Sequence, residues 1–290
     1  MFGFLRPHPG KGRRLGTARD WAELKAVSDI PNADDRKYWR VHDDYYDLSN
    51  FDHPGGVDWI NITKGNDVTE LFESSHPDIE KARLLLKKYK VTSTKEPRNS
   101  GAFTFEKDGF YSVFRERAWK SLKKTGSGPT LQMLFIHDSL LAAFLILLTC
   151  TMNPFIDLRS WLALSIFAGV FLQCLGTCSH NFYHRRKNWR MYTWDLTPYS
   201  SFEWRISHCY SHHVFANTAY DYECMAFEPF LLWLPVPKSF LRLLLTPIMI
   251  FLLSAIGMHM QVIQYFLGYF LFKSGCYNGL SFTFRVFYVM

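Results

Sequence analysis

Two long apolar segments in the second half of the chain constrain its fold more than any other feature. Residues 131–151 form the first segment and residues 161–177 the second. A helix that crosses a bilayer needs about 20 mostly apolar residues, so we expect both segments to span a membrane. Two further apolar stretches follow. Residues 241–257 predict a third crossing, and residues 258–272, which are short for a span, predict either a fourth crossing or a re-entrant hairpin. The chain is therefore expected to be a multi-pass membrane protein.

Charge is distributed unevenly along the 290 residues. The chain is 48% hydrophobic and carries a net charge of +7, yet its mean hydropathy is only -0.09, so a polar part must balance the apolar one. Many basic residues flank the first two apolar segments, where the positive-inside tendency places them on the cytosolic side. These residues are Lys120, Lys123, Lys124, Arg185, Arg186, Lys187 and Arg190. The position of these residues beside membrane spans accounts for the net positive charge, and we expect no nucleic-acid partner.

The N-terminal part has the composition of a cytosolic module. Residues 1–20 form a basic tail without the apolar core of a cleavable signal peptide. The six cysteines are scattered and form no small secreted framework, so we expect reduced thiols. Cys174 and Cys178 are four residues apart, and we expect them to pack in a helix rather than to bind zinc.

A histidine in a glycine-rich loop is the most distinctive feature of residues 21–95. Short apolar runs at 38–41 and 45–48 predict two strands, and the sequence His53-Pro54-Gly55-Gly56 follows. Proline stiffens such a loop, while glycine allows conformations that other residues adopt only at a cost. The loop can therefore hold one imidazole in a fixed direction.

A second histidine, His76, lies between two predicted helical stretches, residues 67–73 and 79–89. Two histidines at the edges of helices, with apolar neighbours, predict a flat pocket that suits haem, because neutral imidazoles ligate its iron and apolar walls exclude water. The expected neighbours are Leu48, Phe51, Phe72 and Leu84.

These residues resemble the cytochrome b5 family. The matching positions are residues 46–48, Phe51, residues 53–56, residues 65–69, Phe72 and His76. The resemblance implies a haem b cofactor with His53 and His76 as its axial ligands, and a domain that transfers single electrons.

Residues 96–130 are expected to connect this domain to the membrane. Residues 96–101 have the composition of a linker, and residues 103–122 mix aromatic with basic side chains. This stretch predicts either an amphipathic helix at the membrane interface or a helix packed on the first domain.

Five histidines follow the second apolar segment in two groups. His180 and His184 are four residues apart, so they share one face of a helix. His208, His212 and His213 form the second group. A nitrogen-rich set suits iron or copper, and such clustered polar residues near a bilayer are typical of function rather than packing. His137, within the first apolar segment, is expected to be a packing residue.

The two groups resemble the histidine boxes of membrane fatty-acid desaturases and related hydroxylases. The matching residues are 180–184 and 204–213, followed by Asn217. The resemblance implies a non-haem di-iron centre held by these five histidines, a fatty-acyl substrate and oxidoreductase activity. It also implies an endoplasmic-reticulum membrane location, with the haem domain and both boxes in the cytosol, and cytochrome b5 reductase as the electron source.

The sequence departs from the family in two ways. The second box has three residues between its first two histidines, where many members have two. The third box, which contains a final pair of histidines, is absent, since only His259 follows His213. We therefore expect a shortened chain with an incomplete metal site and an atypical tail at 274–290. An inactive membrane-anchored electron carrier or a regulatory partner is the alternative function.

The expected fold is an α+β cytochrome b5-like haem domain followed by an all-α, desaturase-like but incomplete membrane domain with about four transmembrane helices. The expected order is a basic tail at 1–20, the haem domain at 21–95, a linker and interfacial helix at 96–130, the membrane domain at 131–273 and the atypical tail at 274–290.

Overall fold

The computed structural model describes residues 17–99, 103–126, 128–197, 199–225, 231, 233 and 237–252. The chain divides into two compact units. The first unit comprises Met1–Gly128 and Arg205–Lys238, and the second comprises Pro129–Trp204 and Ser239–Met290. The predictions that concern His259, the fourth crossing, residues 274–290 and most of the basic tail lie outside the described residues.

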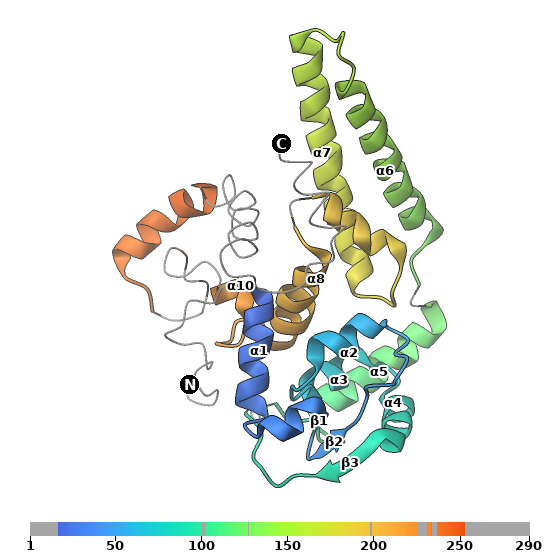
Figure 1. Cartoon of the computed structure of the whole chain (residues 1–290), viewed down its shortest axis with the longest axis vertical. Coiled ribbons are helices and arrows are strands. Elements are labelled where there is room, and N and C mark those ends of the chain that lie inside the picture. Colours follow the sequence, from blue (N-terminus) through green and yellow to red (C-terminus); the bar gives the residue numbers. More distant parts are fainter. Residues whose placement is uncertain are drawn as a thin grey trace. The chain divides into compact units, whose positions relative to one another are not determined.

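A three-stranded antiparallel sheet lies within the first unit (Figure 1). Its strands are β1 (Trp39–Val41), β2 (Asp44–Tyr46) and β3 (Lys90–Ser93), in the order β1-β2-β3. Trp39 pairs with Tyr46 in the first hairpin. Both predicted strands are confirmed, while β3 follows the predicted helical stretch at 79–89 and was not foreseen.

Short helices complete the first unit. They are α1 (Ala18–Asp29), η1 (Ala33–Lys37), α2 (Val57–Thr63), α3 (Thr69–Ser75), α4 (Ile79–Leu86), η2 (Lys87–Tyr89), α5 (Phe110–Thr125), the π-helix η4 (Arg205–His212), α9 (His213–Phe215) and α10 (Tyr222–Met225). Helix α1 begins at a capping box in which Thr17 and Asp20 exchange hydrogen bonds. It buries Trp21 completely, and Trp39 of β1 is 2% exposed, so both tryptophans are core residues.

Helix α5 contacts the sheet-bearing part of the first unit. The hydroxyl of Tyr111 donates to the carbonyl oxygen of Glu73, and Arg115 forms an ion pair with the Glu73 carboxylate at 2.7 Å. Phe110, in contrast, is 87% exposed. One face of the helix therefore packs on the first unit, as one of the two sequence alternatives predicted.

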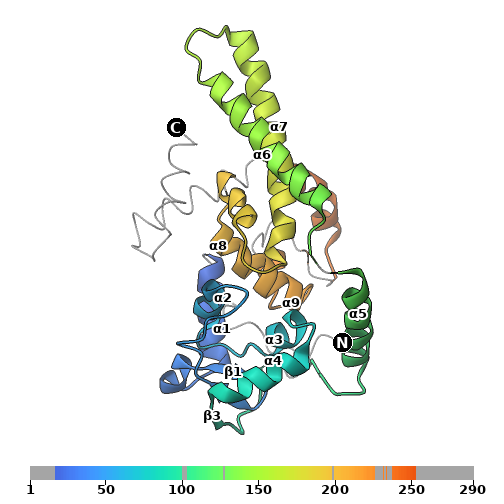
Figure 2. The same cartoon turned by 90° about the vertical axis from the view of Figure 1, so that its right-hand side faces the viewer.

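The second unit contains the two long apolar helices. Helix α6 (Leu131–Thr151) and helix α7 (Leu158–Tyr183) lie side by side in both views (Figures 1 and 2), and Phe144 of α6 is fully buried. Both helices are long and apolar enough to cross a membrane. The same unit holds η3 (Trp189–Leu196), α8 (Ser201–Trp204) and the shorter apolar helix Phe240–Leu252.

Helix α6 has the predicted bounds, whereas α7 extends beyond the predicted 161–177 at both ends. Asp157 caps its N-terminus by accepting hydrogen bonds from the backbone of Arg159 and Ser160. At the other end, the helix continues through the first histidine box to Tyr183. The first box therefore begins on the last turns of an apolar helix.

Candidate functional site

The imidazoles of His53 and His76 face each other within the first unit. Their ring centroids lie 6.0 Å apart and their planes are perpendicular. Two axial ligands with metal–nitrogen bonds of about 2 Å place their ring centroids roughly 6 Å apart on opposite sides of an iron. The structure thus brings together the two residues that the sequence predicts as haem ligands, at a spacing that fits the cofactor.

Backbone groups hold both rings by their Nδ1 atoms. The Nδ1 atom of His76 lies 2.8 Å from the carbonyl oxygen of Phe72, and the backbone N–H of Gly55 donates to Nδ1 of His53 at 3.1 Å. The Phe72 carbonyl oxygen can only accept, so the proton of a neutral His76 lies on Nδ1 and its Nε2 carries the lone pair that an iron needs. Phe51 and Phe72 pack on the two imidazoles, with ring centroids 5.9 and 4.8 Å away.

Burial favours neutral imidazoles at this site. Desolvation is the main cause that lowers the pKa of His53, and the neighbouring His76 lowers it further. Desolvation also lowers the pKa of His76. Neutral rings are the form that ligates iron. Of the predicted apolar neighbours, Leu48 is buried, whereas Leu84 is 64% exposed.

Gly55 is required at its position by the ring of His53. A Cβ atom at residue 55 would lie 2.8 Å from Cε1 and 2.9 Å from Nδ1 of that imidazole. Such distances are too short for any side chain, so the absence of a side chain lets the ring take its position.

Glu73, one turn before His76, is a buried carboxylate with three cationic or polar partners. It lies 2.8 Å from Nε2 of His42 and 2.7 Å from the guanidinium groups of Arg83 and Arg115. Burial alone would raise the pKa of Glu73, but these hydrogen bonds outweigh it and lower the pKa to about 2. The sequence does not predict this network, because its members are distant in the chain.

The second histidine box lies on the π-helix η4 and the start of α9. In an α-helix, residues five apart would point about 140° from each other. The wider π-helix, with its i to i+5 hydrogen bonds, instead brings His208 and His213 together, and their Nε2 atoms lie 2.9 Å apart. His212 stacks on His208 with ring centroids 5.5 Å apart. The three histidines of this box therefore gather on one face.

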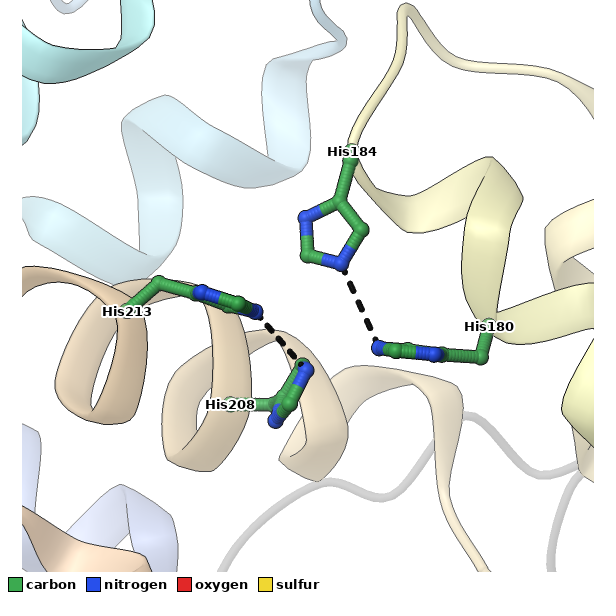
Figure 3. Close-up of side chains that lie close together, drawn as sticks. All are labelled: His180, His184, His208 and His213. Carbon is green, nitrogen blue, oxygen red and sulfur yellow. Dashed lines mark hydrogen bonds between the residues drawn. The ribbon is translucent and has the colours of Figure 1, made fainter. Parts of the chain in front are cut away.

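The first box forms a similar pair within the second unit. The Nε2 atoms of His180 and His184 lie 3.3 Å apart (Figure 3). The figure also shows the 2.9 Å contact between His208 and His213. Two nitrogen ligands of one ion, each at about 2.1 Å, are separated by roughly 3 Å when they are adjacent in its coordination shell. Each pair therefore has the spacing of two ligands of one metal ion.

Carboxylates that the sequence reasoning missed contact the second box. Nδ1 of His208 lies 3.0 Å from Glu223, and Nδ1 of His212 lies 2.9 Å from Asp221. The two acidic residues follow the box within ten positions in the sequence, but the sequence pattern does not predict the turn that brings them back to it. Asp221 is fully buried, and hydrogen bonds to it outweigh desolvation and lower its pKa.

Two cysteines near the box have raised pKa values. Burial raises the pKa of Cys209 to about 12, and the pKa of Cys224 is raised to about 12 by burial and by Asp221. In the chain without a metal ion, both thiols are therefore in the neutral form at neutral pH. The five cysteines in the described part of the chain are free thiols, as predicted, and Cys178 is buried.

His137 lies outside these groups, as the sequence predicts. It is fully buried in the second unit, where Nε2 contacts the Thr193 hydroxyl at 2.9 Å and Nδ1 contacts Asp138 at 3.0 Å. Both ring nitrogens therefore serve helix packing.

The second box is part of the same compact unit as the haem-ligand pair. The Tyr210 ring contacts Trp21 of α1 edge-on at 5.3 Å, and the ammonium group of the buried Lys25 lies 5.6 Å from the Tyr210 centroid. Arg205 forms a 2.5 Å ion pair with Asp58 of α2, the helix that follows the His53 loop. The sequence predicts a membrane domain at 131–273, and Arg205–Lys238, which lies within this range, belongs to the first unit in the structure.

Comparison with known proteins agrees with this geometry. Residues 20–95 match the family model described as cytochrome b5-like heme/steroid binding domain. The chain is 38% identical over 225 residues to cytochrome b5-related protein of Drosophila melanogaster. The matched region covers 77% of this chain and 49% of that protein. No solved structure matches the chain.

Weaker similarity extends to desaturases. Probable Delta(5) fatty acid desaturase C of Dictyostelium discoideum is 29% identical over 68% of this chain and 45% of its own length. Acyl-lipid (8-3)-desaturase B of the same organism is 28% identical over 57% of this chain and 37% of its own length. The chain spans about half or less of the length of these relatives. Residues 20–95 therefore form a cytochrome b5-like domain, which implies haem binding, in a chain distantly similar to fatty acid desaturases.

Proposed function

We propose that this chain is a membrane-bound haem protein of fatty-acid metabolism, in which a cytochrome b5-like domain delivers electrons to a non-haem iron centre of the desaturase type. His53 and His76 would hold haem b. His180, His184, His208, His212 and His213 would supply ligands to the iron centre, which when bound activates oxygen for attack on an acyl chain.

The observation that carries this proposal is the packing of the second histidine box in one unit with the haem-ligand pair. Arg205 of the box helix is 4% exposed at its side chain and pairs with Asp58, five residues after His53. An electron donor that is folded together with metal ligands needs no diffusional encounter with them.

The membrane part of the proposal rests on α6 and α7, which are long and apolar enough to span a bilayer. We propose about four crossings in the endoplasmic-reticulum membrane, with the haem domain and both boxes in the cytosol and cytochrome b5 reductase as the electron source. The basic cluster at 185–190 after α7 supports a cytosolic exit for that helix.

Metal analysis and lipid analysis of the full chain test the proposal. Purified protein is expected to contain one haem and about two non-haem irons per chain, and cells that express it should accumulate acyl chains with a new double bond or hydroxyl group. Variants His208→Ala and His180→Ala should remove the new product and retain the haem spectrum. Haem without any non-haem iron would contradict the desaturase assignment.

A membrane-anchored electron carrier is the second candidate. It is supported by the haem-ligand pair, which is assembled among the described residues. It predicts a reducible haem and no change in acyl products, whether or not the box histidines are intact.

A further inference from the structure

Immediately after the second histidine box, the chain turns back and packs against the box. Helix α9 is followed by a turn in which Asn217 has a left-handed backbone, with φ of 58°. Ser211, fully buried between the box histidines, fixes the returning segment. Its hydroxyl donates to the carbonyl oxygen of Tyr220 at 2.8 Å and accepts the backbone N–H of Tyr222 at 2.6 Å. The turn thus brings the residues on either side of Tyr222 against the box.

Those residues, Asp221 and Glu223, each meet one histidine at Nδ1. Oδ2 of Asp221 lies 2.9 Å from Nδ1 of His212. The two carboxylate oxygens of Glu223 lie 3.0 and 3.2 Å from Nδ1 of His208. A carboxylate only accepts hydrogen bonds, so the proton of each imidazole is held on Nδ1 and the lone pair is left on Nε2.

Neighbouring donors fix the Asp221 carboxylate itself. Its Oδ2 also accepts the backbone N–H of Asn217 at 2.9 Å and the thiol of Cys224 at 3.1 Å, and Oδ1 accepts the backbone N–H of Cys224 at 3.2 Å. These donors fix the Asp221 carboxylate in the orientation in which Oδ2 meets Nδ1 of His212.

We propose that Asp221 and Glu223 are positioning residues of the non-haem metal site: they hold His212 and His208 in the Nδ1–H tautomer, so that both rings present Nε2 to a metal ion. This inference rests on the proposed function. Carboxylate partners of ligating histidines fix the ring orientation and raise its basicity, and their loss typically lowers metal affinity by about 10- to 100-fold.

Cobalt(II) binding to the purified full chain in detergent tests the inference. Cobalt reports imidazole ligation through its visible absorption. Asp221→Asn and Glu223→Gln are each expected to weaken cobalt binding by about 10- to 100-fold. Asp44→Asn is the matched control, because Asp44 of β2 contacts Ser93 and Lys90 of β3, in the same unit and remote in sequence from the box. It should bind cobalt as the unchanged chain does.

Two further measurements separate positioning from general damage. The haem spectrum and content of each variant should remain unchanged, since a misfolded first unit would lose haem as well. Nitrogen-15 NMR of histidine-labelled protein should show the Nδ1–H tautomer for His208 and His212 in the unchanged chain. It should show loss of that signal for one histidine in each variant.

The outcomes distinguish the inference from the proposed function. If the unchanged chain binds no cobalt, the metal site and the proposed function both fail. If it binds cobalt and both variants bind it equally well, the positioning role is wrong and the metal site stands. A thiolate-to-cobalt absorption band that disappears in Cys224→Ser would show that His212, Asp221 and Cys224 bind the ion themselves, and would overturn the inference.

Discussion

At the scale of single residues, Gly55 offers a direct test of the haem-ligand assignment. Gly55→Ala places a Cβ atom 2.8 Å from the His53 ring, so the ring must move and haem affinity should fall by roughly tenfold, about 1.4 kcal/mol. Haem titration followed at the Soret band measures this affinity. Gly128→Ala is the control, because a Cβ atom there meets nothing within 4 Å.

Substitution of the ligands themselves should have a larger effect. His53→Ala or His76→Ala removes one axial ligand and should abolish the spectrum of a haem with two histidine ligands. His42→Asn is the control, since His42 has a positive φ, which asparagine tolerates, and its side chain is 42% exposed. A normal haem spectrum in both alanine variants would refute the assignment.

Glu73 should make the stability of the first unit depend on acid pH. The pKa of Glu73 is about 2 in the folded chain and near 4.5 without its contacts to His42, Arg83 and Arg115. The stabilisation by the Glu73 carboxylate is therefore fully present above about pH 4.5 and is lost as the pH falls toward 2. The difference corresponds to about 3 kcal/mol. Denaturant unfolding of Glu73→Gln should show this loss at pH 7 and little difference near pH 2. Glu106→Gln, at an exposed site, should behave like the unchanged chain.

The residue types of the haem site could be predicted from the sequence, because the loop 53–56 and the spacing to His76 are local patterns. The carboxylates Asp221 and Glu223 could not, since their role depends on the turn that folds them back on the box. The Glu73 network is likewise formed by residues up to 42 positions apart.

At the scale of elements, the packing of η4 on α1 should stabilise the second box. Tyr210 is 1% exposed and Trp21 is fully buried, so Tyr210→Ala should destabilise the first unit by about 3–5 kcal/mol. Phe110→Ala, which removes an 87% exposed ring, should change it little. Thermal unfolding monitored by haem absorbance distinguishes the two variants.

The sequence predicted where a helix lies more reliably than which type of helix forms there. The apolar length of residues 131–151 defined α6 at both ends. The extra residue between the first two histidines of the second box appeared as a departure in the sequence, and the π-helix gives its physical reason. A helix with i to i+5 hydrogen bonds accommodates the longer spacing while it keeps the histidines on one face.

At the scale of the whole molecule, the two apolar helices predict which segments face each side of the membrane. The connector between α6 and α7 contains Phe155, which is 94% exposed, and Lys187 follows the first box. In intact microsomes, an impermeant thiol reagent should label Lys187→Cys directly and Phe155→Cys only after permeabilisation. Labelling is measured over the unchanged chain, whose own cysteines set the background. The reverse pattern would contradict a cytosolic position for the boxes.

The membership of the second box in the first unit also changes how stability and metal binding are related. Any ligand that binds only the folded form of a unit stabilises all of that unit by mass action. Haem bound between His53 and His76 would therefore also stabilise Tyr210 and the box helix, which belong to the same unit. Loss of haem should then lower the affinity of the box for metal, and a metal ion in the box should in turn strengthen the retention of haem. If the chain binds both proposed cofactors, the supply of one would then influence the binding of the other.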